Sequence, residues 1–211
     1  MMLRSTPSTP NRMSNPYRRL VLAGGLGFAA TIALASCANE QPAALNLPEI
    51  RFQDKAPFRL KASAVKIVDD AAVAAGSPEW ANIFPTLPRK AMRNWGQDRL
   101  VADPAAVNIA RYRISEASTE HSLGKKAKGV LKAARQEKFM IRVAGDLEIR
   151  QPDGILIRAV SGKSWGEQSV PVDAKPADRK LAIDSLVRRV MAGFDREMET
   201  AIRANMADLA F

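Results

Sequence analysis

The sequence predicts an α+β domain, in which an antiparallel sheet of about four strands is covered by a long C-terminal helix and a shorter helix. Residues 139–150 alternate apolar and polar side chains, which is typical of a strand with one buried face. Residues 178–206 repeat apolar side chains every three or four positions, which is typical of an amphipathic helix. At about 1.5 Å per residue, such a helix can cross a small sheet completely. The predicted order is β-α-β-β-β-α.

The first half of the domain is predicted from weaker patterns. Residues 58–68 begin with apolar side chains at alternate positions and predict the first strand. Thr86 can cap a helix and Pro88 suits its first turn, so we expect the shorter helix to run from there to about Val101. Residues 107–117 predict the second strand.

A hairpin is predicted after residue 150, because Pro152-Asp153-Gly154 supplies turn residues. The apolar residues Ile155, Ile157 and Ala159 continue as the partner strand, so this pair is expected to be an antiparallel hairpin. The C-terminal helix is expected to cover this sheet. Its alternative role, lying on a membrane surface, is disfavoured because the sheet would then lack a cover.

The amino-terminal part ends in Leu34-Ala35-Ser36-Cys37, which contains the only cysteine of the 211 residues. Several arginines precede an uncharged apolar run over residues 20–34. That run is shorter than a membrane-crossing helix needs, and it is followed by the small residues that a signal peptidase requires.

This motif resembles the bacterial lipoprotein signal, the lipobox. The resemblance implies that a lipid is attached to Cys37 through a thioether, that the chain is cut after Ser36, and that acyl chains such as palmitate complete the anchor. Each buried methylene contributes about 0.8 kcal/mol, so several chains hold a protein lastingly. An ordinary signal peptide with an incidental cysteine is one alternative. Export through the twin arginine Arg18-Arg19 is another, although its flanking residues match poorly, and Met13 is an alternative start.

We therefore expect a signal peptide over residues 1–36, a lipidated cysteine and flexible tether over residues 37–57, and a periplasmic α+β domain over residues 58–211. Four of the 32 basic residues and none of the 22 acidic ones precede Cys37, which leaves the remainder with a net charge of +6. This charge favours acidic neighbours such as anionic lipid headgroups or an acidic envelope protein, and nucleic acid is not expected in that compartment. Lipidation would leave no thiol for a disulfide.

No catalytic, cofactor-binding or metal-ligating set is predicted. His121 is the only histidine and is interpreted as a solvated loop residue. Asp69-Asp70 could bind a metal but is more typical of a solvated turn. Trp165, beside Gly162 and Gly166, could mark an exposed contact.

A segment rich in basic residues, from Lys125 to Lys138, is the one feature that suggests a function. It is interpreted first as a solvated loop, and alternatively as a contact with an anionic membrane surface at about 1 kcal/mol per charge. Its basic residues are Lys125, Lys126, Lys128, Lys132, Arg135 and Lys138.

The element order resembles that of bacterial lipoproteins that assist envelope transport, including auxiliary lipoproteins of ABC-type transporters and the lipoprotein of lipopolysaccharide assembly. The lipobox and residues 58–70 also resemble uncharacterised alphaproteobacterial lipoproteins. These resemblances imply a non-enzymatic accessory or assembly subunit of an envelope complex. The alternative is a module that binds a lipid or other amphiphile between helix and sheet, and an enzyme ranks third. In the lipoproteins that this signal resembles, an aspartate directly after the lipidated cysteine retains the protein in the inner membrane. Ala38 occupies that position here, so the resemblance implies the periplasmic face of the outer membrane rather than the inner membrane.

Overall fold

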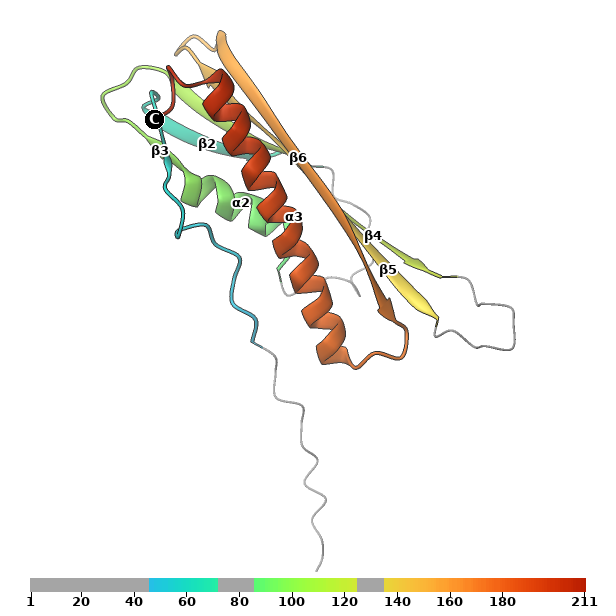
Figure 1. Cartoon of the computed structure of the whole chain (residues 1–211). Coiled ribbons are helices and arrows are strands. Elements are labelled where there is room, and N and C mark those ends of the chain that lie inside the picture. Colours follow the sequence, from blue (N-terminus) through green and yellow to red (C-terminus); the bar gives the residue numbers. More distant parts are fainter. Residues whose placement is uncertain (1–45, 72–85, 125–134) are drawn as a thin grey trace, which may run out of the picture. The chain divides into compact units, whose positions relative to one another are not determined.

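The computed structural model describes residues 46–71, 86–124 and 135–211 (Figure 1). It confirms the α+β class, with a four-stranded sheet and two helices in this part of the chain. The elements are β1 (Phe58–Leu60), β2 (Ala64–Asp69), α2 (Pro88–Arg99), β3 (Leu100–Ala102), β4 (Ile109–Leu123), β5 (Gln136–Arg150), β6 (Leu156–Pro171) and α3 (Pro176–Asn205).

The main sheet has the strand order β2-β4-β5-β6. The pairs β4/β5 and β5/β6 are antiparallel, as expected for strands that follow each other closely along the chain. The pair β2/β4 is parallel, because the chain passes through α2 before it returns to the sheet. A second, two-stranded parallel sheet joins β1 to β3.

The strand predicted over residues 58–68 is divided in two. Ala62 is fully buried and its N–H donates to the carbonyl of Leu60, so the chain bends there. Phe58 and Leu60 point into the core as expected, but Ala64 is exposed because the bend shifts the phase of the alternation. β1 and β2 therefore belong to different sheets.

The shorter helix, α2, begins with Pro88 in its first turn as predicted. The residue at its N-cap is Leu87 and makes no side-chain capping bond, so the prediction of Thr86 as the cap was wrong. The helix ends at Arg99 and continues directly into β3, which takes the place of the last predicted helical turn.

The long C-terminal helix is confirmed. α3 lies along β6 and also packs on β5 and α2 (Figure 1). All members of its predicted apolar stripe are buried: Ile183, Leu186, Val187, Val190, Met191, Phe194, Met198 and Ile202. No helix in the described ranges is long and apolar enough to cross a membrane.

β5 shows the predicted alternation along its whole length. The antiparallel pairing predicted for β5 and β6 is confirmed, and the apolar residues Ile155, Ile157 and Ala159 are exposed. A register shift where β6 begins, opposite Ile149 and Arg150, changes the phase of the strand.

The buried face of β6 consists mainly of small side chains, which let α3 approach the sheet closely. A Cβ atom added at Gly162 would lie 2.7 Å from Cγ of Met198, and one at Gly166 would lie 2.9 Å from Cγ2 of Val190. A Cβ atom at Gly193 of α3 would lie 2.5 Å from Oγ of Ser164. The contact between α3 and β6 is therefore filled at these positions.

Candidate functional site

The segment before β1 is bound to the domain. Ile50 and Phe52 are only 4% and 5% exposed and belong to the hydrophobic core. We call residues 48–56 the stem. The tether expected over residues 37–57 thus includes a docked part, while residues 37–45, with Cys37, lie outside the described residues.

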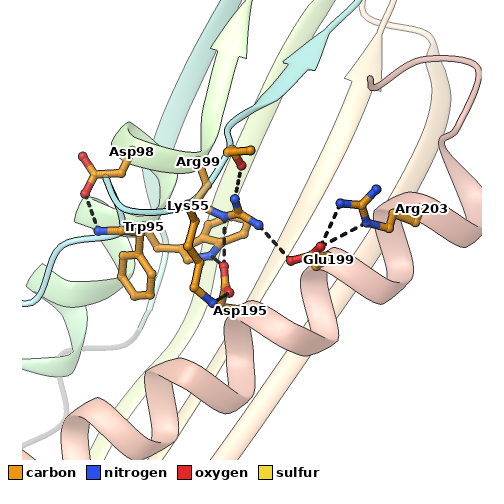
Figure 2. A network of polar contacts seen from close by, with 9 residues as sticks. Lys55, Trp95, Asp98, Arg99, Asp195, Glu199 and Arg203 are labelled. Carbon is orange, nitrogen blue, oxygen red and sulfur yellow. Dashed lines mark hydrogen bonds and ion pairs between the residues drawn. The ribbon is translucent and has the colours of Figure 1, made fainter.

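Asp195 of α3 is the centre of the stem's attachment (Figure 2). Its side chain is fully buried and accepts three hydrogen bonds. Nε1 of Trp95 and Nε of Arg99, both on α2, donate to Oδ1 over 2.8 and 3.0 Å. Nζ of Lys55 in the stem donates to Oδ2 over 2.5 Å. One carboxylate therefore joins α2, α3 and the stem.

Arg99 extends this network towards the surface (Figure 2). Its side chain is 2% exposed, and Nη1 donates to the carbonyl of Ala56 in the stem. Nη2 donates to Oε2 of Glu199 over 3.0 Å, and Arg203 donates to the other oxygen of Glu199 over 2.9 Å. The Arg99 guanidinium also lies 4.6 Å from the centre of the Phe58 ring, close enough for a cation–π contact. The buried cation is thus well compensated.

Polar groups along α2 hold the rest of the stem. Asp98 accepts a hydrogen bond from the backbone N–H of Phe52 over 2.9 Å and two from the guanidinium of Arg51. Nδ2 of Asn94 donates to the carbonyl of Ile50 over 3.0 Å. These bonds fix both the backbone and the side chains of the stem.

The contacts of Asp195 and Asp98 favour the ionised form of these two carboxylates. Burial alone would raise the pKa of Asp195, but the hydrogen bonds from Lys55 and Trp95 and the charge of Arg99 outweigh burial and leave this pKa below its ordinary value. The pKa of Asp98 is also lowered, because the bonds from Arg51 and Phe52 outweigh its desolvation. Both carboxylates therefore favour the folded domain when they are charged.

Acidification is expected to weaken the domain through these two groups. Because their pKa values are lower in the folded state, their contribution is present above the unfolded aspartate pKa of about 3.9 and is lost as the pH falls through the folded values. Denaturant unfolding at pH 6 and pH 3 should show a smaller loss of unfolding free energy in Asp195→Asn than in the parent. An equal loss in both proteins would contradict this role.

His121 lies on β4 rather than in a solvated loop, which corrects the interpretation from sequence. Its Nε2 lies 3.1 Å from Oε2 of Glu137, and Oε1 of that buried carboxylate lies 2.5 Å from Nη2 of Arg179 on α3. The imidazole also packs on Phe139, with 5.0 Å between ring centres. This cluster ties β4, β5 and α3 together at one end of the sheet.

The acidic pair at the end of β2 is held by arginines. Asp69 lies 3.3 Å from Arg89 and 3.1 Å from Arg93, both on α2, and Asp70 lies 3.3 Å from Arg111. In the described ranges, no group of three or more His, Cys, Asp or Glu side chains could hold a metal ion.

Only part of the predicted basic segment can be placed, because Lys125, Lys126, Lys128 and Lys132 lie outside the described residues. Arg135 donates to the carbonyl of Gly124 over 3.1 Å, and Lys138 pairs with Glu167 at 2.6 Å on the outer face of the sheet. Trp165 is 67% exposed on that same face.

The structure thus shows a small α+β domain with an N-terminal stem docked on α2 and α3. No protein-family model matches the chain. No curated protein matches it either.

Similar solved structures include two bacterial lipoproteins. Rare lipoprotein B from Shewanella oneidensis is 11% identical with a TM-score of 0.34, covering 65% of this chain and 94% of its own. Uncharacterized lipoprotein B from Nitrosomonas europaea is 14% identical with a TM-score of 0.30, covering 73% and 95%. A structure described as a neuraminyllactose-binding hemagglutinin homologue from Helicobacter pylori is 10% identical with a TM-score of 0.35, covering 74% and 96%. Similarity of this degree assigns no function to the chain.

Proposed function

We propose that this chain is a lipid-anchored lipoprotein of the periplasm that acts as a non-enzymatic accessory or assembly subunit of a cell-envelope transport complex. The anchor is Cys37, on the basis of the lipobox formed by residues 34–37. The stem supports this arrangement, because a docked stem transmits the position of the anchor to the domain.

The observation that carries the proposal is the filled contact between α3 and the sheet. An amphiphile held there would need space that the close approach of Met198 to Gly162 and of Val190 to Gly166 does not leave. Phe194 and Ile141 are fully buried in the same layer. The domain therefore offers partners its outer surface, which is how an accessory subunit acts.

The distance between anchor and domain is limited by the chain. The carbonyl of Pro48 accepts a hydrogen bond from Arg188, so docking begins there. Residues 38–47 remain between Cys37 and the stem, and an extended chain spans at most about 3.3–3.6 Å per residue, or roughly 35 Å here. The domain is thus expected to act close to the membrane that carries the lipid.

Crosslinking in native membranes tests the proposal. The full-length chain and a Cys37→Ala variant would each be crosslinked, purified through a C-terminal tag and examined by mass spectrometry for proteins and lipids. We expect a protein of an envelope transport system to be enriched with the parent and lost with the variant. Recovery of a bound lipid without such a protein would favour the amphiphile-binding alternative and contradict the accessory role.

The outer membrane is the proposed location, because Ala38 rather than aspartate follows the lipidated cysteine. Membranes separated on a density gradient should show the parent mainly with outer-membrane markers. Ala38→Asp places a carboxylate beside the headgroups and should shift the protein towards the inner membrane. Recovery of the parent with inner-membrane markers would refute this location.

A further inference from the structure

β6 is a long edge strand with one unpaired side. It pairs with β5 and ends the main sheet, and no strand in the described ranges pairs with its other edge. Nη2 of Arg189 donates a hydrogen bond to the carbonyl of Glu167 over 3.3 Å. Nε2 of Gln168 donates to the carbonyl of Ser169 over 3.2 Å. Because backbone groups of successive residues point alternately to the two sides of a strand, the odd-numbered residues of β6 face this free edge.

The same residues place their side chains on the outer face of the sheet. Lys163, Trp165 and Glu167 are exposed there, and Trp165 lies opposite Arg142 of β5. Proteins usually protect such an edge with charged side chains, a proline, a bulge or a cover. The only proline of β6 is its last residue, Pro171, and its register shift lies at the opposite end. No proline or register shift interrupts the middle of β6, and its charged side chains, Lys163 and Glu167, favour a partner strand that carries the complementary charges.

We propose that a second copy of this chain binds this edge, so that the two β6 strands pair antiparallel about a two-fold axis at Trp165. In this register the tryptophans of the two copies face each other. Lys163 of each copy lies opposite Glu167 of the other, and this pairing occurs twice. The two charges stand at equal distances on either side of Trp165, so the edge is complementary to itself.

The charges on β6 favour the register with its axis at Trp165 over the registers whose axis is shifted by two residues in either direction. A two-fold axis at Lys163 would place two ammonium groups opposite each other, and an axis at Glu167 would place two carboxylates opposite each other. Like charges directly opposite destabilise a strand pair, whereas opposite charges stabilise it. Glu167 already pairs with Lys138, and a carboxylate with two oxygens can accept a second cation.

Cysteine crosslinking of the full-length chain in membranes tests the register. The axis at Trp165 places Ser161 opposite Ser169 of the second copy, at the Cα separation of about 5.5 Å that a disulfide requires. Ser161→Cys and Ser169→Cys should form a disulfide dimer under mild oxidation when the two are co-expressed. When expressed alone, each variant should form no more disulfide dimer than the parent, whose sole cysteine is Cys37. No dimer in the mixture, or an equal dimer of Ser161→Cys alone, would overturn the proposal.

Charge reversal tests the partner independently of crosslinking. In mild detergent, Lys163→Glu alone or Glu167→Lys alone should weaken dimerisation of the full-length chain by roughly tenfold or more, measured by analytical ultracentrifugation. Mixing the two variants should restore the dimer, because every opposed pair then carries opposite charges. The control is Lys66→Glu, an equal charge change on the exposed outer face of β2. The proposal would be overturned if the mixed variants did not form a dimer, or if the parent were monomeric. Neither result would affect the crosslinking experiment that tests the proposed transport partner.

Discussion

Replacing Phe194 with aspartate is expected to lower the free energy of unfolding by more than about 4 kcal/mol, enough to unfold many domains. The Phe194 side chain is fully buried where α3 meets the sheet, and its ring packs edge-on against Trp95 with 5.2 Å between centres. An aspartate there would be an unpaired charge in an apolar layer, directly beside the buried Asp195. Urea denaturation followed by circular dichroism measures the loss.

Phe194→Leu is the matched control, because it keeps the site apolar and should cost only about 1–2 kcal/mol. If the aspartate variant unfolded at the same urea concentration as the parent, α3 would not be the cover of the sheet.

Asp195→Ala is expected to destabilise the domain by about 3–5 kcal/mol. The substitution removes the carboxylate that accepts hydrogen bonds from the buried Trp95 Nε1 and from Lys55 Nζ, and it leaves Glu199 as the one carboxylate in this network that contacts the buried Arg99 guanidinium. Truncating one partner of a buried ion pair is costly because the other charge remains buried. Thermal or urea denaturation gives the stability change, and limited proteolysis shows whether cleavage near Lys55 becomes faster as the stem detaches.

The control for this prediction is Arg203→Ala. Arg203 forms an exposed pair with Glu199 on the same helix, and such pairs contribute about 0–1 kcal/mol. Equal effects of Asp195→Ala and Arg203→Ala would show that the buried network does not hold the stem.

The sequence was most informative where one side of an element is packed along its whole length. β5 lies in the middle of the sheet and α3 covers that sheet, so every second or every third to fourth side chain of these elements must be apolar. Their patterns could therefore be interpreted without knowledge of the rest of the fold.

β6 could not be interpreted in the same way. The face of β6 that α3 covers includes Gly162, Ser164 and Gly166, whose small size matters only because α3 lies so close. The apolar residues that predicted the strand, Ile155 and Ile157, lie at its exposed end near the register shift. Small residues and a shifted register leave no signal in hydrophobic periodicity.

The attachment of the stem was also missed, although one signal was present. Asp195 falls within the apolar stripe of α3, four residues after Met191 and three before Met198, and an acid in such a stripe indicates a buried partner. The partners, Lys55 and Arg99, are 140 and 96 residues away in the chain, so spacing alone could not identify them. A segment rich in proline and alanine was interpreted as a tether because its few anchoring residues show no periodicity.

Mass spectrometry of the mature amino-terminal peptide, isolated from native membranes, decides whether Cys37 carries a lipid anchor. We expect a chain that begins at Cys37, with diacylglycerol on its sulfur and an acylated amino group. Cys37→Ala should accumulate as the uncleaved precursor. An unmodified Cys37 in the mature protein, or normal processing of the Cys37→Ala variant, would contradict the lipid anchor.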